Sequence, residues 1–222
     1  MDVTDEEFGG MMVTLEQGDS LKSAPRSHRR LVTPEIEAWW ADPVGAIRGV
    51  ADRAVSPSMR LWFRRMAEVG SWQLQLHKAA HGATRAGYYL SCPGIRGAEV
   101  GPPPANLVVN HLPSALSNYY NLIGYVDWMG FGAAGGLDGP VGHMPLTAFK
   151  FDYRGAAVDL ARTFVFGWSP SGGMIVYTAD GLGGWLNQGS HEIRLLGSVT
   201  DTIDWVYGEL LADRCPDYFS LR

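Results

Sequence analysis

The chain has 222 residues, of which 46% are hydrophobic and 18% charged, and this composition excludes a largely disordered protein. The length fits one large domain, or one domain with an extension, better than two full-sized domains. The net charge of −5 is unevenly distributed: residues 1–96 contain 12 Lys and Arg against 11 Asp and Glu (+1), whereas residues 97–222 contain 6 against 12 (−6).

The charge and the cysteine content restrict partners and compartment. An acidic C-terminal half repels phosphate backbones and attracts basic proteins, so we expect a protein partner and no direct binding of nucleic acid. No stretch approaches the roughly 20 apolar residues of a membrane helix, and the acidic first residues are unlike a signal peptide. Cys92 and Cys215 make neither a disulfide framework nor a cysteine metal site. We expect a cytoplasmic protein without a membrane association.

The first third of the chain has mixed signals. Residues 1–33 show little hydrophobic periodicity, and we interpret them as a flexible lead-in. Thr33-Pro34 is typical of a helix start, because Thr33 can cap the helix and proline is tolerated at its first position. Apolar side chains over 57–80 predict a longer helix broken near Gly70-Ser71, and Tyr88-Tyr89-Leu90 predicts a short strand.

A proline run marks the best internal boundary of the chain. Gly101-Pro102-Pro103-Pro104 cannot continue regular structure, because proline lacks a donor and restricts the residue before it. We therefore expect residues 34–105 to form a helical N-terminal extension that packs on a main unit formed by residues 106–222.

Two helices and a set of strands are expected in that main unit. Leu116, Tyr119, Tyr120 and Ile123 repeat at helical spacing before Gly124, and a capped helix start at Ser198 precedes a second apolar stripe. Between them, aromatic and β-branched segments separated by glycine predict strands, with a hairpin turn at Asp180-Gly181. Consecutive strands favour an α+β class with a mainly antiparallel sheet flanked by helices.

These motifs occur in a recognisable order. A helix begins at Leu112-Pro113 with paired aromatic residues and ends at Gly124; then come a strand leading to Gly172-Gly173, the Asp180-Gly181 turn with Trp185, and a capped helix with Trp205. This order, over roughly residues 106–213, resembles the SUKH superfamily. The resemblance implies an α+β binding scaffold: bacterial members are mostly immunity proteins that neutralise the toxin domain of a polymorphic toxin, and fungal relatives are regulatory scaffolds. It supplies no catalytic residues.

No sequence motif indicates an enzyme or a cofactor strongly. The G-x-S-x-G pentapeptide is absent, and Gly130 to Gly136 lacks the Lys-Ser/Thr of a phosphate loop, so a surface loop is the better interpretation. His77 and His81 have the H-x-x-x-H spacing of a metal site, but this spacing is common by chance and a solvated helix end is favoured. We expect a protein that is not an enzyme and that has no metal and no cofactor.

A protein-binding surface is the favoured interpretation of the acidic residues. We expect Asp138, Asp180, Trp185 and Glu192 to contact a basic toxin domain, with loops 130–142 and 180–185 as the contact points. Trp185 lies beside Gly184 and a turn, so it is a candidate interface anchor, although a core position is the default for tryptophan.

Three functions stay open on the sequence alone. The first is an immunity protein that occludes the active site of its toxin. The second is a regulatory scaffold without a toxin partner. The third is an enzyme with a site at His77 and His81 or among the acidic residues.

Overall fold

The structure is a computed structural model that describes residues 3–4, 10–79, 85–105, 107, 112–128, 135–141 and 143–217. Its α-helices are α1 (Arg26–Arg29), α2 (Pro34–Ala41), α3 (Pro43–Arg53), α4 (Pro57–Val69), α5 (Ser114–Tyr120) and α6 (Val199–Leu211). Short 3-10 helices are η2 (Leu21–Ser23), η3 (Leu146–Ala148) and η4 (Leu160–Arg162).

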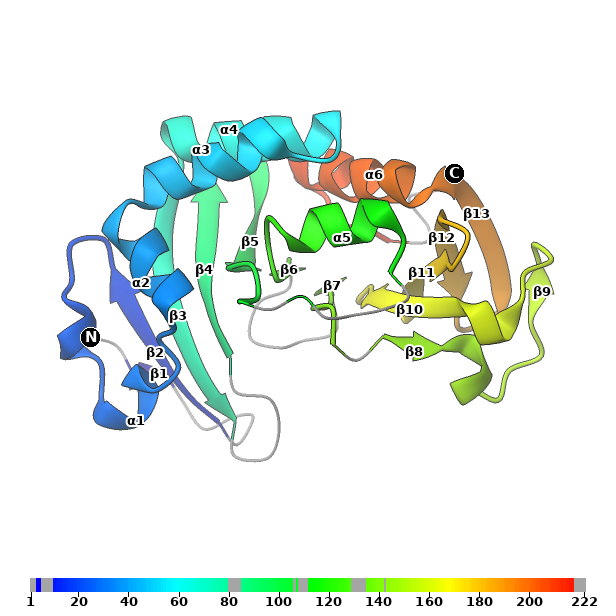
Figure 1. Ribbon diagram of the computed structural model, residues 1–222, viewed down its shortest axis with the longest axis horizontal. Helices are drawn as coiled ribbons and strands as arrows, with labels where there is room; N and C mark the ends of the chain where they lie inside the picture. The colour runs from blue at the N-terminus through cyan, green and yellow to red at the C-terminus, as the bar shows by residue number, and fades with distance from the viewer. Residues whose placement is uncertain are drawn as a thin grey trace.

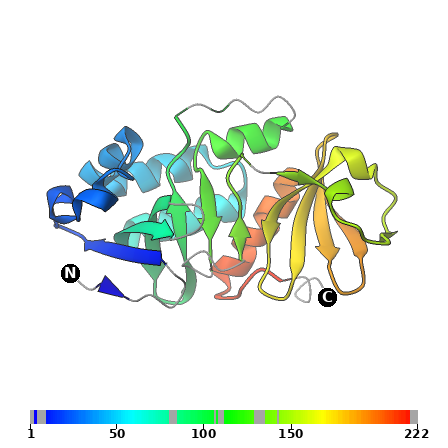
Figure 2. The same ribbon diagram turned by 90° about the horizontal axis from the view of Figure 1, so that it is seen from below.

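The strands of the described residues belong to one sheet. They are β1 (Val3–Thr4), β2 (Gly10–Glu16), β3 (Ser71–Ala79), β4 (Arg85–Cys92), β5 (Ile95–Gly101), β6 (Tyr125–Asp127), β7 (Gly136–Leu137), β8 (Met144–Pro145), β9 (Arg154–Gly155), β10 (Thr163–Trp168), β11 (Gly173–Thr178), β12 (Leu182–Asn187) and β13 (Glu192–Ser198). Neighbours follow the order β1-β2-β3-β4-β5-β6-β7-β10-β11-β12-β13-β9, and β8 pairs with β10. Figure 2 shows these strands from β2 on the left to β13 on the right.

Nearly every strand pair in this sheet is antiparallel, and the exception is the parallel pair of β13 with β9. The α+β class with a mainly antiparallel sheet is therefore confirmed. Figure 1 shows α3, α4 and α6 along one side of the strands. The sheet continues across residue 105 through the pairing of β5 with β6.

The first hundred residues contribute more strand than the sequence indicated. The expectation of one helix over residues 57–80 is wrong in its second half, where β3 replaces it. Trp72, Leu74 and Leu76 are buried at alternate positions, a spacing that suits a strand with one face on the core. The expected helical extension, residues 34–105, thus contains β3, β4 and β5, and the predicted strand at 88–90 is confirmed within β4.

Residues 10–33, expected to be a flexible lead-in, also carry regular structure. β2 pairs with β3 along its whole length, and Val13 and Leu15 are buried against the helices. Alternation of these two apolar residues with polar ones was too short a pattern to stand out from the sequence. The segment then continues through η2 and α1.

Local sequence explains where α4 and α6 begin. The Ser56 hydroxyl accepts a hydrogen bond from the Met59 N–H, and Pro57 occupies the first turn of α4. Ser198 and Asp201 form a reciprocal capping box at the start of α6. The expected helices near 113–123 and 199–212 are confirmed as α5 and α6.

Two hydrophobic cores lie on opposite faces of the C-terminal strands. In the larger core α4 packs on α6, and the Tyr207 ring lies 5.7 Å from Trp62 and 5.9 Å from Phe63. The smaller core contains Leu146, Val165, Met174, Val176, Leu186 and Ile193, with aromatic residues of 149–153 packed on it. α6 therefore covers one face of β12 and β13, while the segment from η3 to η4 covers the other.

Trp185 should be among the most costly core positions to truncate. Its side chain is fully buried under α6, with its ring 5.1 Å from Trp205. We expect Trp185→Ala to lower the free energy of unfolding by about 3–5 kcal/mol, because a large cavity would remain. Urea denaturation measures the change, and Leu61→Ala, at a position 53% exposed, is the control expected to stay within about 0.5 kcal/mol. Equal effects of the two substitutions would contradict this packing.

Candidate functional site

The acidic residues predicted to bind a partner do not form a single patch. Asp180 lies in the turn between β11 and β12, whereas Glu192 begins β13. Because Leu182 pairs with Ser198 and Asn187 pairs with Glu192, the two carboxylates lie at opposite ends of the β12–β13 hairpin. The structure therefore separates these two predicted contact residues.

Asp138 lies nearer the Glu192 end of the sheet. It follows β7, and its carboxylate accepts a hydrogen bond of 2.9 Å from the indole Nε1 of Trp168, the last residue of β10. Thr163, the first residue of β10, pairs with Thr178 close to Asp180. Asp138 and Asp180 are thus near different ends of β10. Residues 130–134 and 142 of the predicted contact loop 130–142 lie outside the described residues.

Trp185 is a core residue. Its side chain has no exposed surface and packs edge-on against Trp205 of α6. The default interpretation of this tryptophan therefore holds, and in this conformation the ring is not available as an interface anchor.

One end of the C-terminal sheet combines exposed carboxylates with an exposed apolar side chain. We call it the acidic end and define it by Asp159, Asp180, Leu182 and Asp201. The Val199 N–H donates to the Gly181 carbonyl at 2.9 Å, which holds the β11–β12 turn against the start of α6. Leu182, two positions after Asp180 and paired with Ser198 across the hairpin, is 43% exposed. An apolar side chain with a polar rim is the usual composition of a protein-binding patch.

Two carboxylates at the acidic end, those of Asp201 and Asp180, accept hydrogen bonds from neighbouring side chains. The hydroxyl and backbone N–H of Ser198 donate to the Asp201 carboxylate at 2.8 and 2.7 Å, and these bonds lower the pKa of Asp201. Asp201 is therefore ionised at neutral pH. Asp180 accepts a bond of 2.9 Å from Arg162, but both side chains are largely exposed, so solvent screens this pair.

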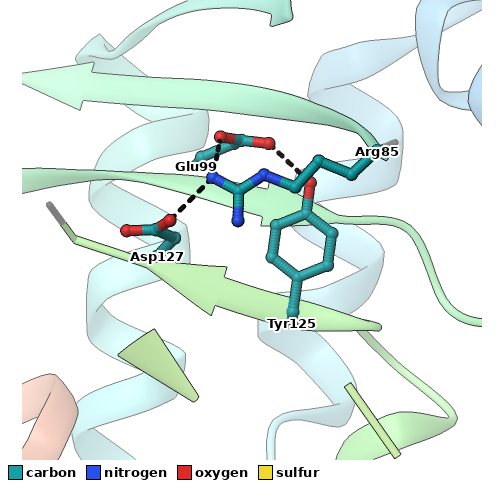
Figure 3. Close-up of polar contacts among 4 residues, drawn as sticks. All are labelled: Arg85, Glu99, Tyr125 and Asp127. Carbon is teal, nitrogen blue, oxygen red and sulfur yellow. Dashed lines mark hydrogen bonds and ion pairs between the residues drawn. The ribbon is translucent and has the colours of Figure 1, made fainter. Parts of the chain in front are cut away.

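A second arrangement of charged groups lies inside the sheet, where β4, β5 and β6 meet (Figure 3). Arg85 Nη2 donates to Glu99 Oε2 at 2.9 Å and to Asp127 Oδ2 at 2.7 Å. The Tyr125 hydroxyl donates to Glu99 Oε1 at 2.5 Å, and the Arg85 guanidinium carbon lies 5.2 Å from the centroid of the Tyr125 ring. We call these four residues the ionic cluster.

The carboxylates of the ionic cluster are sealed from solvent. Glu99 is 2% exposed and Asp127 is 5% exposed. Burial raises the pKa of Glu99 above its ordinary value, although the charge of Arg85 and the hydrogen bond from Tyr125 favour its ionised form. The cluster thus bonds both buried carboxylates to one cation and ties three strands together.

Two glycines make room for the ionic cluster. A Cβ on Gly87 would meet the Tyr125 hydroxyl and the Glu99 carboxylate, and a Cβ on Gly101 would meet the Tyr125 ring. Any larger residue at either position would displace these side chains.

The other sequence candidates are not drawn into one site. His77 pairs across the strands with Arg85, and its pKa is lowered, first by burial and then by the Arg85 charge. His81, the other half of the predicted pair, lies outside the described residues. Within the described ranges, no three His, Cys, Asp or Glu side chains are grouped to hold a metal ion. His143, which had no assigned role, bonds Tyr120 at 2.9 Å and Tyr177 at 3.1 Å.

Sequence reasoning missed the ionic cluster for a physical reason. Arg85, Glu99 and Asp127 are separated by 14 and 28 positions in the chain, and they meet only after the register of three strands is fixed. A weak signal was present: Glu99 stands between Ala98 and Val100, so it points away from the core face at strand spacing.

Comparison with protein-family models, curated proteins and solved structures gave no match. In the part of the chain that is described, none of the helices has both the length and the apolar composition that crossing a membrane requires.

Arg85→Met should destabilise the fold in a pH-dependent way. The substitution leaves two buried carboxylates without their cation, so the free energy of unfolding should fall by about 3 kcal/mol at neutral pH. Arg85 lowers the pKa of Glu99, so its loss raises that pKa further. A raised carboxyl pKa favours the fold while the group is protonated, and this contribution is lost as pH rises through the folded-state value. The deficit, measured by urea denaturation, should therefore be smaller at acidic pH than at neutral pH.

Two further variants control this experiment. Arg64→Met removes an exposed pair with Asp52, at 3.5 Å, and should change stability by less than about 1 kcal/mol. Adding Glu99→Gln to Arg85→Met should restore part of the lost stability, because it removes one uncompensated charge. A deficit for Arg85→Met no larger than that of Arg64→Met would contradict the assigned role.

Proposed function

We propose that this chain is a non-enzymatic, SUKH-like binding protein that acts in the cytoplasm as an immunity protein and occludes the active site of a cognate toxin domain. The observation that carries the proposal is the acidic end: Leu182, 43% exposed, is two positions from Asp180 and pairs with Ser198, which bonds the Asp201 carboxylate, and Asp159 is exposed as well. Such a patch suits a basic cleft whose centre is apolar, since the charges guide encounter and the apolar contact slows release.

The order of elements supports the SUKH-like part of the proposal. α5 begins just after Leu112-Pro113, antiparallel strands follow, the Asp180-Gly181 turn joins β11 to β12, and the capped helix α6 closes the unit. These elements carry the sequence motifs on which the resemblance depends.

The buried carboxylates support a binding role over a catalytic one. Among the described residues, Glu99 and Asp127 are two buried carboxylates that share one cation. Each is bonded to Arg85, and they are 2% and 5% exposed. A general acid or base must reach its substrate, and these two do not. The exposed carboxylates at the acidic end are instead free to face a partner surface.

The acidic end should govern both association and dissociation of the partner. The partner is first isolated by co-purification with the full chain from the native host, and binding is then measured by surface plasmon resonance. Asp180→Lys should slow association roughly threefold to tenfold at low salt, and added salt should reduce this difference. Leu182→Ala should mainly speed dissociation, by roughly tenfold, because it removes an apolar contact.

Glu192→Lys is the matched control, since it makes the same charge change at the opposite end of the hairpin. It should affect association much less than Asp180→Lys. If the Glu192 variant shows the larger effect, the contact face is at the other end of the sheet and the assigned face is wrong. If no stoichiometric protein partner is recovered, or if the partner contacts only residues 1–105, the proposed function is wrong.

A further inference from the structure

Two adjoining pockets form one groove beside α1 and the start of β4. The first, of about 560 Å³, is lined by Arg26, Ser27, Arg30, Leu31 and Lys78. The second, of about 450 Å³, is lined by Arg30, Leu31, Thr33, Glu35, Ile36, Arg85, Ala86, Pro102, Pro103, Pro104, Ala105 and Tyr125. Arg30 and Leu31 line both, so the pockets adjoin at these two residues, and each is within the size range of small-molecule sites.

The first pocket concentrates positive charge from two elements. Arg26 and Arg30 are four positions apart across α1 and its C-cap, so their side chains lie on the same side of this turn. Lys78 comes from β3, against which α1 packs. None of the three forms an ion pair with another described residue. Three cations therefore line the pocket with no described carboxylate paired to them.

The number and type of these cations favour phosphate as the ligand group. One carboxylate would neutralise a single cation, whereas a phosphate monoester carries close to two negative charges at neutral pH. Two arginine side chains can each donate two parallel hydrogen bonds to phosphate oxygens. The Ser27 hydroxyl, which already bonds His28 Nδ1 at 3.1 Å, adds a further polar group at the wall.

The second pocket is suited to the rest of such a ligand. Leu31, Ile36 and the prolines 102–104 supply apolar walls, and the Tyr125 ring closes one side. Arg85 is not a free cation here, because its Nη2 is bonded to Glu99 and Asp127. The Thr33 hydroxyl caps α2 and bonds the Glu35 carboxylate, and this carboxylate can also accept from a hydroxyl or an amine of a ligand.

From this juxtaposition we propose that the groove binds a small phosphate monoester that carries a flat or apolar group, the chemical class of a nucleoside monophosphate. Its phosphate lies among Arg26, Arg30 and Lys78, and its apolar part lies towards Tyr125. This site goes beyond the proposed function, because the groove is formed by α1, α2, β3, β4, β6 and the prolines that follow β5, and not by the acidic end.

Calorimetric titration of the full chain tests the site with three probes: AMP, inorganic phosphate and adenosine. AMP should bind at least about tenfold more tightly than either fragment, since it alone fills both pockets. Arg26→Ala/Arg30→Ala should weaken AMP binding by about tenfold or more, and Lys78→Ala should weaken it less. Because the assay needs no protein partner, its result is independent of the proposed function.

The matched control is Arg48→Ala/Arg60→Ala, which removes the same charge from exposed positions on α3 and α4. It should change AMP affinity by less than about twofold, as expected for distant charges screened by salt. Circular dichroism melting checks that each variant stays folded. Absence of AMP binding at millimolar concentration, an equal loss in the control, or equal affinity for AMP and inorganic phosphate would overturn the proposal. Tighter binding of single-stranded oligonucleotide than of AMP, lost in the same variant, would also overturn it.

Discussion

The pairing of β5 with β6 is the constraint on which the rest of this structure depends. It joins only three residue pairs, Glu99 with Asp127, Val100 with Val126 and Gly101 with Tyr125, yet it connects the strands before residue 101 to those after residue 125. The ionic cluster lies on one face of this pairing, and α6, packed on α4 and β5, lies on the other. A short pairing is thus reinforced from both sides, by charge on one and by apolar packing on the other.

The sequence was sufficient where structure is local. The capping box at Ser198 and Asp201, the apolar stripe after it and the Asp180-Gly181 turn depend on residues a few positions apart, and each prediction was correct. It was insufficient where structure depends on distant pairing. β3 looked like the end of a helix, because Trp72, Leu74 and Leu76 extend the apolar run of α4, although they alternate with Gln73, Gln75 and His77 at strand spacing in the sequence. The cations at Arg26, Arg30 and Lys78 converge for the same reason, since α1 reaches β3 only in the folded chain.

The fold separates charge of opposite sign. The basic groove is lined by residues of β3, β4 and β6, and the acidic end lies at β11 and β12, with β7 and β10 between them in the sheet order. Formal charge differs between the two halves of the sequence, and of the acidic half Glu99 and Asp127 are buried with Arg85 and contribute little to the surface. The exposed acidic charge is therefore carried by loops and by the start of α6, and this is where a basic partner would be attracted.

The ionic cluster also explains why the two charged regions keep a fixed relation. Side chains alternate between the two faces of a strand, so a shift of β6 by one residue would turn Asp127 and Tyr125 towards the apolar core and Val126 away from it. Burying the Asp127 carboxylate away from Arg85 would cost several kcal/mol, far more than a displaced apolar contact of similar size. Apolar packing alone would tolerate other registers in so short a strand. The buried charges discriminate between them, and through β6 and β7 they set the position of every C-terminal strand relative to the basic groove.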